Sequence, residues 1–359
     1  MNKQELASRI WQIANDLRGS MEASEYKDYI LGFIFYKYLS DNEYEFLIRV
    51  GYGDEDIAAL DDGSEERETY IGNIKENLGY YIAPKDLYQN WIQLGSSFTV
   101  DNVVTALSAF QRNISANTHH QKVFSGIFNT LETGISKLGL NAPQRTKQVR
   151  SLVDLIRDIP TTNDEYDVLG YIYEYLIGKF AAGAGKSSGE YYSPHEVSDI
   201  MANVTANHLK DRKTIEVYDP TSGSGSLLLN IGKSFEMHKD TDDNVKYYAQ
   251  EYVGSTEILT RMNLVMRGIK PSNIVTRNGD SLEADFPYFD ESDPENTYEA
   301  VFVDAVVSNP PYSQKWDPRD KDQDPRFAGY GLAPKSKADY AFLFHPLTPT
   351  VNISRFQYD

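Results

Sequence analysis

The residues best suited to chemistry follow an apolar run with β-strand character, and they are Asn309, Pro310, Pro311 and Tyr312. Two consecutive prolines cannot continue a strand ladder, so the chain must leave the sheet rigidly here. The Asn309 side-chain oxygen and the Pro310 carbonyl then become fixed hydrogen-bond acceptors. Two such acceptors match the two protons of a planar amino group, while the Tyr312 ring can stack on the heterocycle that carries it. The alternative is an ordinary turn that ends a strand.

A second motif is rich in glycine and follows the β-branched run 213–218. Glycine lets a loop backbone approach a ligand closely, and free N–H groups at the start of the next helix attract anionic groups. The dinucleotide fingerprint G-x-G-x-x-G is not matched, because Leu228 stands in place of its third glycine, so a nicotinamide cofactor is disfavoured. The candidate residues for another ligand are Asp219, Thr221, Gly223, Ser224, Gly225 and Ser226.

Polar residues at the ends of the next two predicted strands extend this site. Glu251 stands 32 residues after Asp219, at a place from which an acid commonly binds the two hydroxyls of a ribose. Asp280 and Ser281 follow the third predicted strand, where a side chain could reach the amino group of an adenine. These positions predict a pocket for an adenine nucleoside.

A further candidate segment precedes these motifs. Ser193 and Glu196 form a capping box with Pro194 at the first helical position, which alone indicates a helix start and nothing more. The aromatic pair before this helix is also suited to clasping an adenine or a carboxylate. The cofactor-binding candidates therefore include Glu190, Tyr191, Tyr192, Ser193, Pro194 and, at the surface of the first turn, His195. The nearby sequence 185–187 is no phosphate-binding loop, because Phe180 stands where that motif requires glycine.

The elements that must position these motifs alternate between strands and helices. Strands are expected at 213–218, 245–250, 274–277 and 299–308, with helical patterns at 226–238 and 255–267. This alternation indicates a parallel, doubly wound α/β sheet. Because the carboxyl ends of parallel strands share one edge of the sheet, we expect the motifs to meet there.

The first part of the chain has a different pattern. Residues 24–39 are apolar on nearly all sides, as in a buried helix, and apolar spacings of three and four continue from Asp101 to about Arg157. We therefore predict an all-helical domain at residues 1–160 and an α/β domain at residues 161–359.

Composition excludes several classes of protein. With 40% hydrophobic and 25% charged residues, the chain has globular composition. No run approaches the roughly 18 apolar residues of a membrane helix, and the start lacks a secretory signal pattern. The absence of cysteine rules out disulfides, cysteine-ligated zinc and thiol nucleophiles. We expect a cytoplasmic protein that uses no metal and contacts no membrane.

Charge bears on any nucleic-acid partner. The formal net charge is −18, so the chain alone is expected to bind DNA weakly and without sequence preference. Residues 301–359 are neutral, with seven basic and seven acidic residues. The basic residues just after the Asn309 turn are either solvated in a mobile loop or placed to contact phosphates: Lys315, Arg319, Lys321 and Arg326.

In this order and spacing, the motifs resemble the modification (M) subunit of type I restriction-modification systems, an N6-adenine DNA methyltransferase. The resemblance covers nearly the whole chain to about His345. It rests on IANDLRGSMEASEYKDYILGFIFYKYLSD, DVLGYIYEYLIGKF, GEYYSP, DPTSGSGSLL, AQE, NGDSL, NPPY and ADYAFLFH.

The resemblance implies a fold, a reaction and partners. The α/β part would be a Rossmann-like class I S-adenosylmethionine-dependent methyltransferase domain. Residues 191–194, the loop 219–226 and Glu251 would bind S-adenosylmethionine, and residues 309–312 would hold a flipped adenine. The implied partners are double-stranded DNA, a specificity (S) subunit, a second M subunit and, in the full complex, a restriction (R) subunit.

Other functions remain open from the residues alone. The same Asn-Pro-Pro-Tyr motif occurs in enzymes that methylate cytosine N4 or a protein glutamine, and the chain could also be a non-catalytic remnant that binds only a cofactor or partner. The family continues after ADYAFLFH with a glycine-containing helix end and further strands, whereas this chain reads PLTPTVNISRFQYD. We therefore expect the C-terminal part of the sheet to be missing.

Overall fold

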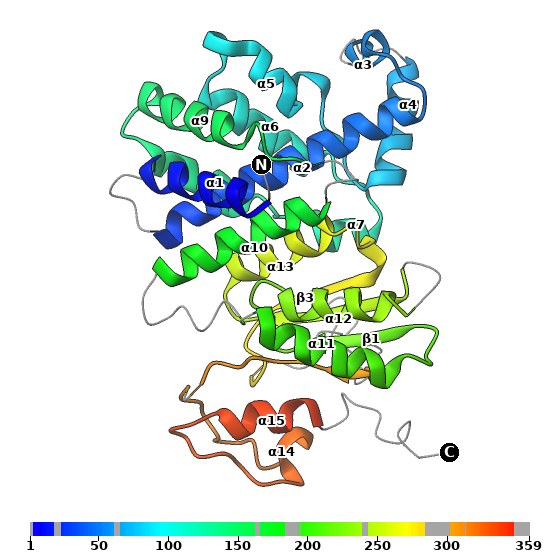
Figure 1. Cartoon of the computed structure of the whole chain (residues 1–359), viewed down its shortest axis with the longest axis vertical. Coiled ribbons are helices and arrows are strands. Elements are labelled where there is room, and N and C mark those ends of the chain that lie inside the picture. The colour runs from blue at the N-terminus through cyan, green and yellow to red at the C-terminus, as the bar shows by residue number, and fades with distance from the viewer. Residues whose placement is uncertain are drawn as a thin grey trace. The chain divides into compact units, whose positions relative to one another are not determined.

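The computed structural model describes residues 3–17, 23–60, 65–161, 166–183, 193, 195–238, 243–283, 302–312 and 314–347. The chain divides into two compact units, Met1–Gly185 and Lys186–Asp359 (Figure 1). The boundary that the sequence suggests, between residues 160 and 161, stays a prediction.

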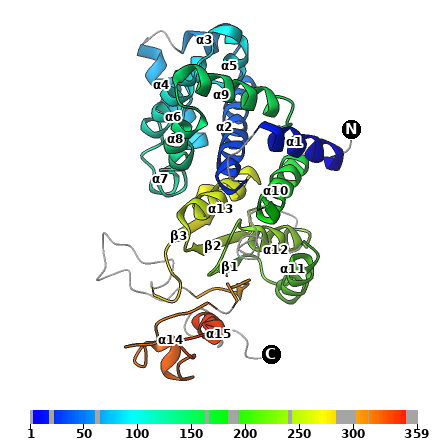
Figure 2. The same ribbon diagram turned by 90° about the vertical axis from the view of Figure 1, so that its left-hand side faces the viewer.

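The first unit is helical throughout its described residues, as the sequence predicts (Figures 1 and 2). None of the described helices of the chain is both long and apolar enough to cross a bilayer. The helices of this unit are α1 (Lys3–Leu17), α2 (Ala23–Arg49), α3 (Asp54–Ala59), α4 (Glu65–Leu78), α5 (Tyr88–Leu94), α6 (Val100–Arg112), α7 (Thr118–Phe124), α8 (Asn129–Gly134), α9 (Ala142–Ile156) and α10 (Tyr166–Gly183).

Helix α2 forms the centre of this unit, because its residues from Ile30 to Leu39 are buried on every side. Tyr36 stacks on Trp91 of α5 with ring centroids 4.6 Å apart and an interplanar angle of 7°. The buried Glu43 carboxylate accepts the backbone N–H of Ile82 at 2.8 Å, which fixes the segment after α4 against α2. Aromatic packing and a few buried polar contacts therefore hold the helices together.

The second unit contains a parallel four-stranded sheet in the order β3-β2-β1-β4. The strands are β1 (Ile215–Asp219), β2 (Val245–Glu251), β3 (Ile274–Asn278) and β4 (Ala305–Val306). The register pairs Asp219 with Ala249 and Glu251 with Asn278. This alignment brings the carboxyl ends of the strands to one edge, as the sequence predicts.

The fourth strand is shorter than expected, since the sequence indicated 299–308. Residues 299–301 lie outside the described part, and the chain then leaves the ladder ahead of the two prolines, which cannot donate to it. Two further backbone bonds flank the strand: Asp304 donates to Glu216 at 2.8 Å and Val307 donates to Tyr218 at 2.9 Å. Among the described strands, β4 forms one edge of the sheet.

Helices cover both faces of the sheet. One face packs against α12 (Ser226–Glu236) and α13 (Gly254–Met266), with α11 (His195–Leu209) beside α12. Helices α14 (Pro325–Ala328) and α15 (Asp339–Leu347) lie on the other side in both views (Figures 1 and 2). The first face is closely packed: a Cβ at Gly232 of α12 would stand 1.9 Å from the Tyr247 hydroxyl of β2, so only glycine fits there.

Candidate active site

The glycine-rich loop occupies the carboxyl end of β1 and begins with a buried acid. Asp219 is fully buried, and its Oδ1 accepts the backbone N–H of Thr221 at 2.9 Å, whereas its Oδ2 has no hydrogen-bond partner among the residues that the structure describes. Gly223 and Gly225 have φ angles of 57° and 80°, a left-handed conformation that favours glycine. The carboxylate oxygen that has no described partner therefore lies at the start of a buried glycine turn.

Two buried residues of α13 hold this loop in place through hydrogen bonds to its backbone carbonyls. Sequence reasoning did not identify them. The Thr260 hydroxyl donates to the Gly223 carbonyl at 2.8 Å, and the Asn263 amide donates to the Ser224 carbonyl at 3.0 Å. Both side chains are fully buried. Their only sequence signal is that polar residues stand on the apolar face of a predicted helix.

Glu251 joins the end of β2 to the same loop. Its Oε2 accepts the backbone N–H of Gly223 at 3.0 Å, and its Oε1 accepts that of Val253 at 2.9 Å. A carboxylate has about four acceptor positions, so this side chain can accept further hydrogen bonds after making these two. Glu251 therefore fixes the conformation of the loop at Gly223.

The segment after β3 completes this edge. Asp280 caps its own turn by accepting the backbone N–H of Leu282 at 2.9 Å. The buried Ser281 hydroxyl donates to the Pro220 carbonyl, so this side chain supports the loop after β1. Both residues lie at the carboxyl edge of the sheet, where the sequence placed them. Only Asp280 is partly exposed there, whereas Ser281 is buried.

The Asn309 turn meets the loop after β1 directly, because β4 is the neighbour of β1. Ser308 and Thr221 share a hydrogen bond of 2.8 Å between their hydroxyls. The Asn309 Nδ2 donates to the buried Ser193 hydroxyl at 3.1 Å, which leaves the Asn309 Oδ1 as an acceptor. Tyr312 is 76% exposed. The structure thus joins three segments that lie far apart in the sequence.

Some predicted site residues cannot be placed. Glu190, Tyr191, Tyr192 and Pro194 lie outside the described residues. His195 is the first residue of α11, and its side chain also lies outside the described part of the structure.

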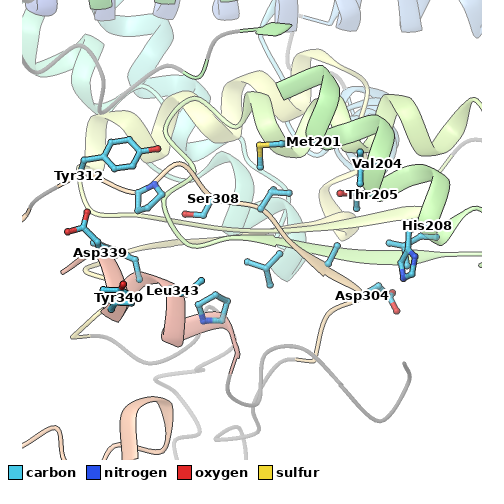
Figure 3. Close-up of a pocket in the computed structure, with 17 residues that line it drawn as sticks. Met201, Val204, Thr205, His208, Asp304, Ser308, Tyr312, Asp339, Tyr340 and Leu343 are labelled. Carbon is cyan, nitrogen blue, oxygen red and sulfur yellow. The ribbon is translucent and has the colours of Figure 1, made fainter. Parts of the chain in front are cut away.

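A cavity of about 820 Å³ extends from the Asn309 turn along β4, between α11 and α15. Ser308 and Tyr312 lie at one end of it together with Asp339 and Tyr340, and His208 lies at the other end (Figure 3). The wall between these ends is mainly apolar, formed by Met201, Val204, Val306, Val307, Phe342 and Leu343. Sequence reasoning did not identify the contribution of α11 and α15 to this cavity.

One of the basic residues after the turn, Arg326, does not lie at the surface, where either sequence interpretation would place it. Arg326 is 3% exposed and donates to Asp324, to the Ser281 carbonyl at 2.8 Å and to the Leu282 carbonyl at 3.3 Å. Arg326 is therefore a structural residue, because its guanidinium donates hydrogen bonds to the carbonyls of the turn that follows Asp280.

Burial controls the charge of Asp219. Desolvation raises the pKa of this carboxyl group to about 7, and the nearby Glu251 charge adds to the increase, although hydrogen bonds from Thr221 oppose it. The folded state therefore binds a proton that the unfolded chain has already released between about pH 4 and pH 7.

We expect Asp219→Asn to remove part of the pH dependence of stability. Because the folded-state pKa exceeds the unfolded value, the Asp219 contribution makes the free energy of unfolding fall as pH rises through this window and level off above it. Urea unfolding at pH 5 and at pH 8 measures the free energy of unfolding at each pH. The decrease between the two should be smaller in the variant than in the wild type. Asp211→Asn, at an exposed position, is the control. Equal losses in the Asp219 variant and the wild type would contradict the expectation.

Comparisons with known proteins agree with this architecture. A family model described as N-6 DNA Methylase matches residues 164–355, and one described as HsdM N-terminal domain matches residues 6–156. The chain is 32% identical to the type I restriction enzyme MpnII methylase subunit of Mycoplasma pneumoniae, over 94% of this chain and 64% of that protein. It is 25% identical to the MjaIX methylase subunit of Methanocaldococcus jannaschii, over 95% and 58%. The chain thus spans less than two thirds of either relative.

A solved structure agrees with the sequence comparisons. The crystal structure of the type I restriction-modification system methyltransferase subunit from Streptococcus thermophilus matches with a TM-score of 0.83 and 31% identity, over 97% of this chain and 72% of that one. Because sequence and fold agree over nearly the whole chain, it belongs to the N-6 DNA methylase family.

Proposed function

We propose that the chain is the N6-adenine DNA methyltransferase subunit of a type I restriction-modification complex and uses S-adenosylmethionine as methyl donor. The observation that carries this proposal is the contact of the Asn309 turn with the loop after β1 through Ser308 and Thr221. That contact sets amino-group acceptors beside the loop that we propose binds a nucleoside. The family and its α/β fold are those of S-adenosylmethionine-dependent methyltransferases.

The residues at the sheet edge fit this cofactor. Within the described residues, the buried Asp219 Oδ2 lacks a hydrogen-bond partner, and the Glu251 carboxylate contacts the same loop at Gly223. Both features suit the hydroxyl and amino donors of an adenosine. When bound, S-adenosylmethionine supplies an activated methyl group on a sulfonium centre. The proposed binding set also includes Thr221, Gly223, Ser224, Gly225, Ser226, Asp280, Ser281 and the segment 190–195.

The residues of the Asn309 turn would act on the substrate amino group. An adenine amino lone pair is conjugated with the ring and is a poor nucleophile. Hydrogen bonds from this amino group to the Asn309 Oδ1 and the Pro310 carbonyl favour a pyramidal nitrogen, and therefore the transition state over the flat ground state. Ser193 holds the Asn309 amide in the orientation that presents its oxygen. Most of the remaining effect comes from positioning.

The target base must leave the duplex to reach this turn. Extrusion of a base costs a few kcal/mol, which stacking on an aromatic side chain offsets in part. Tyr312 is exposed at the end of the cavity beside β4 and is suited to this stacking. Its place beside Pro310 would bring the amino group of a stacked base to the proposed acceptors.

We expect Glu251→Ala to weaken binding of S-adenosylmethionine by about 1–3 kcal/mol, since the variant loses charge-assisted hydrogen bonds and the contact that shapes the Gly223 turn. Equilibrium dialysis with labelled cofactor measures the change. Glu76→Ala on the exposed side of α4 should bind like the wild type. Unchanged affinity in the Glu251 variant would remove this residue from the proposed cofactor site.

The proposed partners follow the type I restriction enzyme relatives. We infer double-stranded DNA as substrate, with a specificity subunit, a second copy of this chain and a restriction subunit in the complete assembly. The proposed division of labour assigns transfer to residues 161–359 of this chain, after the helical domain at residues 1–160, and leaves selection of the DNA sequence to the specificity subunit. The support is the family match of each part and the acidic charge of the whole chain, which leaves phosphate affinity largely to a partner.

Product analysis tests the reaction. The chain, assembled with its specificity subunit, is incubated with DNA and methyl-labelled S-adenosylmethionine, and the DNA is digested to nucleosides. The proposal expects label in N6-methyl-2′-deoxyadenosine only. Label in N4-methyl-2′-deoxycytidine, or in glutamine of the protein fraction, would assign a different substrate, and no transfer at all would identify a cofactor- or partner-binding protein.

A further inference from the structure

The basic side chains that follow the Asn309 turn fall into two groups. In the first group each charge is already matched by an acid. Arg319 donates from Nε to both carboxylate oxygens of Asp317 at 2.9 and 2.8 Å, and Lys321 lies 2.7 Å from Glu283. The buried Arg326 pairs with the partly buried Asp324. The charge of each of these three cations is therefore already compensated by a neighbouring carboxylate.

The second group consists of Lys315, Lys335 and Lys337, which we term the lysine patch. All three are exposed, and none makes an ion pair with any residue that the structure describes. Lys335 does act electrostatically on Asp317, but the oxygens of that carboxylate are engaged by Arg319. The patch therefore carries positive charge on an otherwise acidic chain.

Backbone contacts bring these lysines together from two segments. Trp316 donates its backbone N–H to the Lys335 carbonyl at 3.3 Å, and Ala338 donates to the Gln314 carbonyl at 2.8 Å. The Trp316 indole also donates to the Pro334 carbonyl at 3.2 Å. The residues on either side of Lys315 are thus bound to Lys335 and to the neighbour of Lys337. The backbone segments that carry the three lysines therefore lie next to each other.

These segments rest on a small apolar core. Trp316, Phe327, Ala338 and Phe342 are all buried in one cluster, and the rings of Trp316 and Phe327 meet edge to face at 5.3 Å. Trp316, which follows Lys315, and Ala338, which follows Lys337, therefore anchor the two segments that carry the patch. An anchored cation loses less conformational entropy on binding than one on a free loop.

The patch also adjoins the cavity beside β4. Lys315 follows Tyr312 by three residues, and Lys337 precedes Asp339 and Tyr340 by two and three. Tyr312, Asp339 and Tyr340 line the same end of the cavity (Figure 3). A base that enters there would bring the phosphates on either side of it toward these lysines.

We propose that Lys315, Lys335 and Lys337 bind the DNA phosphates that flank the extruded adenine; this inference rests on the proposed function. Lysine ammonium groups act as compact point charges that contact phosphates without reading bases. The patch therefore positions the strand at the cavity and adds affinity without adding sequence preference. A specificity subunit would still select the site.

Charge-matched variants test the patch. The full chain carrying K315Q, K335Q and K337Q is compared with a control carrying K85Q, K147Q and K213Q, which removes three exposed lysines elsewhere. Fluorescence anisotropy with a short labelled duplex measures affinity between about 50 and 200 mM salt. For the patch variant we expect about tenfold weaker binding at the lowest salt and a salt slope smaller by about 2 to 3, with little change in the control. Affinity for S-adenosylmethionine should be equal in all three proteins.

Two results would overturn the proposal. One is equal DNA affinity and salt slope in the patch and control variants, and the other is no binding by the wild type at the lowest salt. A separate assay of methyl transfer distinguishes this failure from failure of the proposed function. DNA binding that depends on the patch without any transfer would overturn the function and leave the phosphate surface standing.

Discussion

Replacing Asn309 by alanine is expected to lower the rate of methyl transfer by about 100- to 1,000-fold, in line with the loss of one preorganised polar group at a reacting centre. Affinity for S-adenosylmethionine should fall much less, because the proposed role of the Asn309 oxygen is toward the substrate amino group, and among the described contacts its amide reaches the proposed cofactor set only through Ser193. Single-turnover transfer in the assembled complex and cofactor binding by the same protein measure the two quantities.

Two further variants separate chemistry from base capture. Ser193→Ala keeps the Asn309 amide but removes the hydroxyl that orients it, so transfer should fall less than in the Asn309 variant. Tyr312→Ala should weaken capture of the extruded base by about 1–3 kcal/mol, which is the usual contribution of base–aromatic stacking. Ordinary turnover in Asn309→Ala would show that the hydrogen-bond mechanism is wrong.

Replacing Arg326 by methionine is expected to destabilise the α/β unit by about 1–3 kcal/mol for each buried carbonyl that loses its donor. Arg326 contacts Asp324, two backbone carbonyls of the Asp280 turn and the His345 Nδ1 at 3.1 Å. His345 in turn shares a 3.0 Å hydrogen bond with the Tyr218 hydroxyl. Urea unfolding followed by circular dichroism measures the loss.

His345 is neutral at neutral pH, so it adds no second positive charge beside the buried Arg326. Burial, together with the Arg326 charge, lowers the pKa of His345 to about 3, so the ring is neutral and can accept from Arg326 at neutral pH. Arg319→Met is the matched control, because Arg319 is exposed and pairs only with Asp317 among the contacts that are described. A wild-type unfolding midpoint in Arg326→Met would contradict the proposed role of the network.

The sequence predicted the elements of the α/β unit well because their signals are local. A β-branched run followed by Asp219 and a Gly/Ser turn indicates a strand end and a helix start wherever the fold places them, and the structure has β1 and α12 there. The same holds for Glu251 at the end of β2. The register of parallel strands then brings these residues to one edge.

The contacts that depend on distant residues could not be predicted. Ser193 and Asn309 lie 116 residues apart, and no local pattern indicates that they form a hydrogen bond. Thr260 and Asn263 appear in the sequence as polar interruptions of an amphipathic helix. Arg326 appears as one member of an exposed basic group, but tertiary packing buries it against the Asp280 turn.

The central claim is that Asp219, the Gly223–Gly225 turn and Glu251 form one site for S-adenosylmethionine. Titration calorimetry of the full chain with this compound tests the claim most directly, with Asp219→Asn and Glu251→Ala as companions. The account predicts saturable binding at one site per chain and weaker binding in both variants. The absence of saturable binding by a folded wild-type chain, or affinity that neither substitution changes, would contradict it.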